Sequence, residues 1–378
     1  MRKPVSVSCV LLCLGLFILP APSLFAQKLP VRTYYGIYDA TRKVPGFPSK
    51  SLKGPKTEQW VDARPKKPYN IGVLLPHLKD SYWQTADYGI VTYARKLGLH
   101  ITLYTAGAYI NFGNQRAQLQ RLVDVDKVDG IILASVDYMK MDPFIAAVTK
   151  AGTPVVALIN DVHAPAISAK SMVSFFQMGY EAGEYVVHHS HGRNIKIAFF
   201  PGPKKSGWAP ESYQGFLAAI FKLRGPHQRI TMLRPLYGDT RPDVQKMRLD
   251  LLNKKENHDV DYIVGNAVAA VAAVGYLRDH RAIQPHAKIV ATYLTSTVYE
   301  QIRKGFILAA PSDQTIMQCK IALDMVVRIL NGEKAGKDLP FRASPLIPLI
   351  SAENIDRYPY DKLFGGKDFR PVVEQFQR

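Results

Sequence analysis

Residues 70–98, which read NIGVLLPHLKDSYWQTADYGIVTYARKLG, decide the fold class of this chain. The apolar run at 71–75 ends at Pro76 and predicts a short buried strand. Apolar residues then recur at helical spacing, with Ser81 and Gln84 placed as a capping box at the start and Gly98 as the stop. A buried strand followed at once by such a helix is the repeating unit of an α/β protein.

The same alternation continues along most of the chain and restarts near residue 175. Strands are predicted at 71–75, 101–104, 130–134 and 155–159, and again at 195–200, 230–236, 262–264 and 289–293. Helices are predicted between them, and a late helix at 313–330 is expected to return to the first lobe. We therefore expect two doubly wound, Rossmann-like lobes.

The first 26 residues form a separate segment. Arg2 and Lys3 precede the apolar run 10–19, and a break containing proline leads to Ala26, so we predict a secretory signal peptide cut after Ala26 and a periplasmic location. Two of the three cysteines lie in this segment. Cys319 remains alone in a helical pattern, which predicts a packed thiol and neither a disulfide framework nor a metal site, and we expect no cofactor.

Two α/β lobes in an exported, cysteine-poor chain resemble the type I periplasmic binding proteins, whose lobes are joined by a three-segment hinge. The expected division is a basic N-terminal arm at 27–67, a first lobe at 68–162 plus 297–341, and a second lobe at 163–296 plus 342–378. We expect the arm to be irregular, with one short strand, and to pack on the first lobe.

Charge and motifs narrow the class of function. The formal net charge is +18 over 378 residues, yet no nucleic-acid-binding signature accompanies it, so we expect a solvated basic surface and no nucleic-acid partner. No GxSxG elbow, HExxH motif, P-loop or GxGxxG fingerprint is present at the required place. We expect a binding protein and not an enzyme. An exported hydrolase or isomerase using cleft carboxylates is the alternative that turnover of a bound compound would support.

Aromatic residues gather at the carboxyl ends of the predicted strands, which is the edge where α/β proteins bind ligands. Aromatic faces attract a methylated ammonium group, at ~1–2 kcal/mol for each desolvated face. Core packing is the alternative for any one of these rings, and helix capping is the alternative for two carboxylates that we add to the set. The candidate ligand-binding residues are Tyr82, Trp83, Tyr109, Phe175, Trp208, Tyr293, Asp313 and Asp80.

A sugar is the competing ligand, and it defines the alternative function of a solute receptor that feeds a transporter. Pyranose-binding relatives use an Arg in the helix start near 206–221 and an Asp after the Asn at 266. This chain has no Arg between Ser206 and Phe221, and Ala267 follows Asn266. These absences count against a polyhydroxylated ligand, whose hydroxyl groups need partners.

Several segments resemble the TorT family of periplasmic trimethylamine N-oxide sensors. They are residues 78–83 (LKDSYW) with Tyr88-Gly89, 176–180 (FQMGY), 201–203 (PGP) with Gly215-Phe216, 312–314 (SDQ) and 369–372 (FRPV). The resemblance implies a binding protein that reports ligand occupancy to the periplasmic domain of a hybrid sensor histidine kinase, which controls genes of anaerobic respiration. It also implies that Tyr82, Trp83, Tyr109 and Tyr293 correspond to aromatic cleft residues of the family.

Two positions depart from the family pattern. Phe175 stands where the pattern has a tryptophan, so an indole N–H that could bind an N-oxide oxygen is lost. Trp208 stands where the pattern has a small residue, and it is the candidate replacement donor. The predicted ligand is therefore trimethylamine N-oxide or a related small methylated amine.

Overall fold

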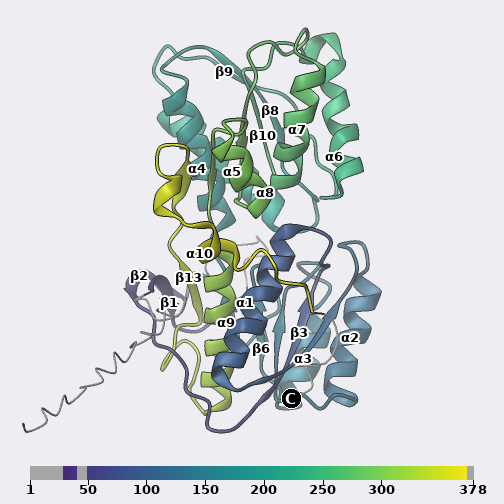
Figure 1. Cartoon of the computed structure of the whole chain (residues 1–378). Helices are drawn as coiled ribbons and strands as arrows, with labels where there is room; N and C mark the ends of the chain where they lie inside the picture. The colour runs from purple at the N-terminus through teal and green to yellow at the C-terminus, as the bar shows by residue number, and fades with distance from the viewer. Residues whose placement is uncertain (1–28, 41–48, 373–378) are drawn as a thin grey trace, which may run out of the picture.

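The computed structural model describes residues 29–40 and 49–372, so the predicted signal peptide at 1–26 lies outside the described residues. Two lobes lie end to end, and each is built on one β-sheet that helices cover (Figure 1). The predicted α/β class with two doubly wound lobes is confirmed. None of the described helices is both long and apolar enough to cross a membrane.

The sheet of the first lobe has eight strands in the spatial order β2-β1-β13-β7-β6-β5-β3-β4. Neighbouring strands from β13 to β4 are parallel, whereas β1 and β2 run antiparallel at one edge. The strands are β1 Pro30–Tyr35, β2 Lys53–Gln59, β3 Asn70–Leu75, β4 His100–Thr105, β5 Gly130–Leu133, β6 Val155–Leu158, β7 Ala169–Ser171 and β13 Arg342–Pro345.

The sheet of the second lobe has six strands in the order β14-β12-β11-β10-β8-β9, and all neighbours are parallel except β12 and β14. The strands are β8 Ile195–Phe200, β9 Ile230–Met232, β10 Tyr262–Gly265, β11 Lys288–Ala291, β12 Ala309–Pro311 and β14 Leu349–Ser351.

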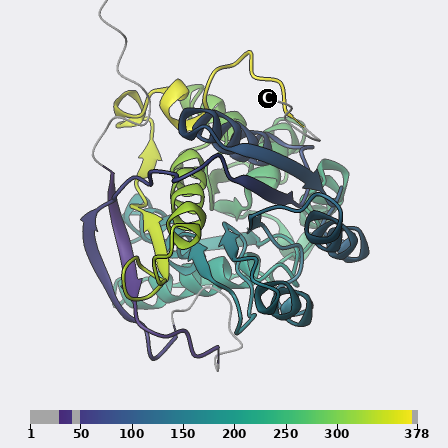
Figure 2. The ribbon, with the colours of Figure 1, turned by 90° about the horizontal axis from the view of Figure 1, so that it is seen from below.

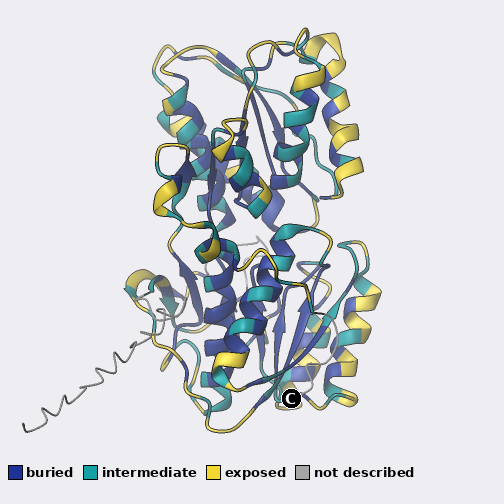
Figure 3. Cartoon of the chain, viewed as in Figure 1, coloured by how far each residue is buried: buried dark blue, intermediate teal, exposed yellow. Residues whose placement is uncertain are grey.

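Helices pack on both faces of each sheet, and the core lies between them (Figures 2 and 3). In the first lobe α1 and α9 share one face and α2 and α3 the other; in the second, α4 and α5 oppose α6 and α7. Cys319 of α9 is fully buried against α1, as predicted. The helices are α1 Ser81–Leu97, α2 Phe112–Asp124, α3 Asp142–Lys150, α4 Phe175–His189, α5 Trp208–Leu223, α6 Pro242–Leu249, α7 Ala267–Asp279, α8 Ser296–Arg303, α9 Thr315–Leu330 and α10 Tyr360–Phe364, with 3-10 turns at Asp250–Asn253, Lys255–Asn257 and Ile355–Arg357.

The basic arm is more regular than expected, because it supplies two strands to the first sheet. β1 pairs antiparallel with β13, and β2 pairs with β1 at the outer edge, where Figure 2 shows both in purple. The segment KGPKTEQ of β2 is almost entirely exposed, so it has no alternation of apolar and polar residues that would predict a strand. Backbone pairing to an open sheet edge forms it instead.

Buried charge anchors the end of the arm on α9. The Asp324 carboxylate accepts hydrogen bonds from the Trp60 indole at 2.7 Å and from the Ala63 N–H at 2.9 Å. It also accepts from the Tyr93 hydroxyl at 2.8 Å and pairs with Lys320 at 2.8 Å. Because Asp324 and Lys320 are both buried, their charges need all of these partners.

The chain crosses between the lobes three times, but at other residues than expected. The crossings lie at 172–174, 312–314 and 346–348, so residues 297–311 belong to the second lobe, and 169–171 and 342–345 to the first. The expected boundaries at 162, 296 and 341 were wrong because the strands beside the crossings have only three or four residues, too few to show a pattern. The helix of residues 315–330 does return to the first lobe, as expected.

The C-terminal tail also returns to the first lobe. After α10 the tail lies along α1, as the yellow segment in Figure 1 shows. The Val372 N–H donates to the buried Asp87 carboxylate at 2.6 Å, and the Phe369 ring meets Tyr88 edge-on at 5.1 Å. Residues after 365 therefore bridge from the second lobe to the first.

Helices α4 and α5 approach each other so closely that only glycine fits at two contacts. A Cβ on Gly215 would overlap the carbonyl oxygen of Phe176, and one on Gly179 would overlap that of Ser212. Both partners are backbone atoms, so side-chain rotation cannot relieve the overlap. This contact fixes the relative positions of the two helix starts, Phe175 and Trp208.

We predict that Gly215→Ala destabilises the protein by at least about 1–3 kcal/mol, because the added methyl group overpacks this contact. Gly113→Ala is the matched control, since a Cβ on that helical glycine meets no atom within 4 Å. Urea denaturation measures both. Equal stability of the two variants would contradict the close contact.

Candidate functional site

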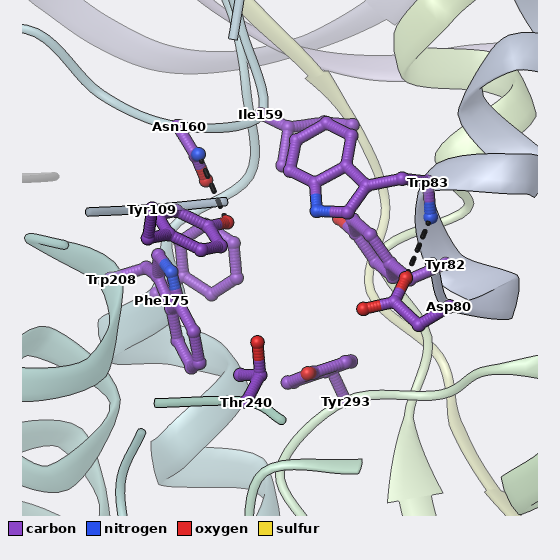
Figure 4. A pocket seen from close by; sticks show the side chains of 10 residues that line it. All are labelled: Asp80, Tyr82, Trp83, Tyr109, Ile159, Asn160, Phe175, Trp208, Thr240 and Tyr293. Carbon is purple, nitrogen blue, oxygen red and sulfur yellow. Dashed lines mark hydrogen bonds between the residues drawn. The ribbon is translucent and has the colours of Figure 1, made fainter. Parts of the chain in front are cut away.

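A cavity lies between the two lobes, and the space among its lining atoms, including open solvent at its mouth, is about 330 Å³. Figure 4 shows its lining side chains pointing toward a common centre. Both lobes contribute, and six of the residues are aromatic. The lining residues are Asp80, Tyr82, Trp83, Tyr109, Ile159, Asn160, Phe175, Trp208, Thr240 and Tyr293.

The topology explains why these residues meet. In the first lobe the lining residues follow β3, β4 and β6. In the second lobe they follow β8, β9 and β11, except Phe175, which comes after the crossing from β7 of the first lobe. Each therefore lies past the carboxyl end of a strand, and the two sheets direct these ends toward each other. Seven of the eight candidate residues line the cavity, and Asp313 does not.

Asp80 has two roles in this geometry. It is the N-cap of α1, because its carboxylate accepts from the Trp83 N–H at 3.1 Å; the expected cap at Ser81 was therefore one residue late. The other carboxylate oxygen lies 3.9 Å from His77 Nε2, and the group faces the cavity (Figure 4). Burial raises the pKa of Asp80, although the nearby His77 and the backbone N–H groups oppose that shift.

Asp313 holds a cavity residue in place without reaching the cavity. The Tyr82 hydroxyl donates to its carboxylate, which also accepts from Thr315 Oγ1 at 3.0 Å and Gln318 Nε2 at 2.8 Å. These three groups cover the buried carboxylate, and Tyr82 stands between it and the cavity. The expectation that Asp313 lines the cleft was wrong for this reason.

The Tyr109 hydroxyl group is held at the cavity wall by Asn160. The Asn160 amide donates to it at 3.1 Å and also to the Ser135 carbonyl oxygen at 2.8 Å, which fixes the amide. Burial raises the pKa of Tyr109, and the hydrogen bond from the Asn160 side chain opposes that shift. Two indole side chains, Trp83 of the first lobe and Trp208 of the second, line the same cavity.

Ring contacts close the cavity across the lobes. Tyr82 of the first lobe meets Tyr293 of the second edge-on, with ring centroids 5.4 Å apart. Tyr293 meets Trp208 in the same manner at 5.7 Å, and Trp208 lies 6.0 Å from Phe175. Because these four side chains are nearly fully buried, the lobes are closed over the cavity.

Glu211 ties together the helix starts that carry Phe175 and Trp208. Its buried carboxylate, on α5, accepts from the Phe176 N–H of α4 at 2.9 Å and from Ser174 Oγ at 3.3 Å. Burial raises the pKa of Glu211 to about 8, although the Arg342 guanidinium and these hydrogen bonds oppose the shift. The Trp208 ring also lies directly on Gly202, where a Cβ would overlap it.

Sequence reasoning missed three lining residues, Ile159, Asn160 and Thr240. Asn160 carried a signal, because it is a polar residue just after the apolar run of β6. Thr240 carried none, since β9 is short and half exposed and the loop after it has no pattern. Within the described residues, no group of three or more His, Cys, Asp or Glu side chains is placed to hold a metal ion.

A family model of the periplasmic binding protein domain matches residues 71–334. The chain belongs to this family. Within it the chain is of the TorT type, because it is 31% identical over 310 residues to the periplasmic protein TorT of Escherichia coli (strain K12), which covers 81% of this chain and 85% of the relative. The resemblance seen in the sequence is confirmed.

Solved structures agree on the fold. An ABC transporter solute binding protein from Bradyrhizobium sp. BTAi1 with bound bis-tris matches with a TM-score of 0.74 at 30% identity, covering 92% of this chain and 98% of that one. The complex of the TorS sensor domain with TorT in the presence of TMAO matches with a TM-score of 0.70 at 26% identity, covering 81% of this chain and 100% of that one.

We predict that stability falls as the pH rises from about 7 to 9 and that Glu211→Gln removes most of this fall. The usual pKa of a Glu is near 4.5, and the folded value is about 8, so folding favours the protonated carboxyl. Its contribution is complete below pH 4.5 and is lost as the pH rises through about 8. Thermal unfolding of both proteins across this range measures the effect, and parallel curves would contradict it.

Proposed function

We propose that this protein is an exported sensor that binds trimethylamine N-oxide or a related small methylated amine in the interlobe cavity. Binding is reported to the periplasmic domain of a membrane sensor histidine kinase. The observation that carries this proposal is the closed cage of six aromatic side chains with one carboxylate, Asp80, at its wall.

The cage suits a methylated nitrogen centre that carries positive charge. Each aromatic ring presents a negative face to such a centre, and desolvation by burial strengthens the attraction. The Asp80 carboxylate adds a full negative charge when it is ionised. The methyl groups would contact Tyr82, Trp83, Phe175 and Tyr293, which come from both lobes.

The same cavity offers donors for an N-oxide oxygen. Trp83 and Trp208 both line the cavity, and their indole N–H groups are the candidate donors to a ligand oxygen. Trp208 supplies the donor that Phe175 lacks. One cavity could therefore hold both the oxygen and the methyl groups of the ligand, with Trp83 beside both.

The relatives support the signalling part of the proposal. TorT forms a complex with the TorS sensor domain, determined both without ligand and in the presence of TMAO. In this chain a ligand in the cavity contacts both lobes, so it favours the closed arrangement by its higher affinity for that state. The kinase domain would respond to the shift in population. The predicted signal peptide at 1–26 would deliver the chain to the periplasm.

A second candidate function is a solute receptor that feeds a transporter. One observation favours it: the ABC transporter solute binding protein with bound bis-tris covers more of this chain than the TorT complex does, 92% against 81%. Bis-tris is a hydroxylated tertiary amine, so that protein too holds an amine. Loss of uptake of an amine in a strain lacking this protein would support the receptor function over the sensor.

We predict saturable binding of trimethylamine N-oxide in calorimetric titration of the mature chain, with ribose giving no heat of binding. Trp83→Ala should weaken binding at least about tenfold, because it removes one cage face and one donor.

Trp208→Phe is the more specific variant, since it keeps an aromatic ring and removes the N–H. It should weaken the binding of trimethylamine N-oxide about tenfold and leave the binding of tetramethylammonium nearly unchanged. Ribose binding, or equal effects of Trp208→Phe on both ligands, would contradict the proposal.

We predict that Asp80→Asn weakens the binding of tetramethylammonium more than the binding of trimethylamine N-oxide. Only tetramethylammonium carries a net positive charge, which the carboxylate would balance. Asn remains a good N-cap, so α1 stays intact. In the unsubstituted protein, tetramethylammonium should bind more tightly as the pH rises through the raised pKa of Asp80. Calorimetry at several pH values tests this, and a flat profile would place the charge balance elsewhere.

A further inference from the structure

Helix α7 carries an apolar stripe on its outer side. Its sequence AVAAVAAVGYLRD has no charged side chain before Arg278. Val268, Val271, Ala272 and Gly275 recur at helical spacing, and all four are only partly buried. A stripe of this kind, left partly open to solvent, is a candidate contact surface for a partner.

Two hollows lie along this stripe and join into one trough. The first opens between the lobes, where residues 79–82 of the first lobe face α7 and Thr297 of the second. The second lies between the later half of α7 and the end of α8, with Phe306 at its rim. Val271 and Gly275 line both hollows. We call the combined surface the α7 trough.

The rim of the α7 trough is positively charged. Its Lys and Arg side chains are all exposed, whereas Asp80, the only acidic residue among those that line the two hollows, faces the ligand cavity as well. Arg278 pairs with Asp279 at 3.0 Å, and no ion pair among the described residues involves the other four cations. The rim cations are Lys79, Lys246, Arg278, Arg281 and Lys288.

The length and the charge of the α7 trough indicate which kind of partner segment would fit it. The 13 residues of α7 span about 20 Å, which matches three to four turns of a helix laid alongside. An apolar floor with a cationic rim fits an amphipathic helix whose polar face is acidic. A second copy of this chain is disfavoured, because its own net charge of +18 would bring like charges together.

We propose that the α7 trough is the surface on which an acidic, amphipathic helix of the kinase's periplasmic domain docks. This inference rests on the proposed sensor function and names the contact surface for it. The hollow at the lobe boundary shares Asp80, Tyr82 and Tyr293 with the ligand cavity. Because both lobes form it, lobe closure around a ligand sets its shape, and a docked helix would sense that closure.

Site-specific photo-crosslinking in the host periplasm tests the docking surface. The full chain carries p-benzoylphenylalanine in place of Val271 or Leu277 in the trough. The control chains carry it in place of Val125 or Phe221, which are 63% and 66% exposed. We expect the trough positions alone to capture the periplasmic domain of a membrane histidine kinase, with the crosslinked peptide, identified by mass spectrometry, lying in an acidic helix.

Charge reversal provides the matched comparison. Arg281→Glu with Lys288→Glu should lower the crosslinking yield about tenfold, whereas Lys222→Glu with Arg224→Glu at the end of α5 should not. Trimethylamine N-oxide affinity should be the same in both double variants, because none of these side chains lines the ligand cavity.

Each other outcome overturns the docking surface. Capture of the kinase from the control positions alone would refute the trough and leave the sensor function standing. Capture of a transporter subunit would refute both the trough proposal and the sensor function. Capture of a second copy of this chain, or of nothing, from the trough positions would refute the proposed occupant, and the separate ligand titration would then decide the sensor function.

Discussion

Parallel strand pairing is the constraint on which this structure depends. A parallel strand needs a crossover, so each strand ends in a loop that leads to a helix start, and all such ends gather at one edge of the sheet. Here two sheets present these edges to each other. Trp83, Phe175 and Trp208 all lie in the first turn of a helix, so one topological rule places them around one cavity.

This rule explains which site residues could be predicted from the sequence. Tyr82 and Trp83 come soon after the apolar run 71–75, so both the strand end and the helix start are evident locally. Asp313 was misplaced because its neighbours in space, Tyr82 and Gln318, decide where its carboxylate points, and no local pattern records them. Thr240 follows a strand whose burial is too slight to leave a pattern.

The secondary structure divides in the same way, into elements that their own residues predict and elements that depend on contacts distant in the sequence. Long buried strands and amphipathic helices were predictable, because each displays its period within its own residues. The lobe boundaries were not, since β7 and β12 have three residues each and exist through pairing with neighbours. The arm strand β2 was likewise unpredictable, and the buried Asp324 that holds the end of the arm lies far along the chain.

The return of the C-terminal tail to α1 gives the hinge a fourth, noncovalent connection. Three peptide crossings let two lobes swing apart, but the contact of Val372 with Asp87 spans the same gap from outside. Helix α10 packs on both α8 of the second lobe and α9 of the first, so opening must either separate α10 and the tail from α9 and α1 or pull α10 away from α8. The tail acts as a tether between the lobes, because the length of chain between α10 and Val372 limits how far the lobes can separate while both contacts hold.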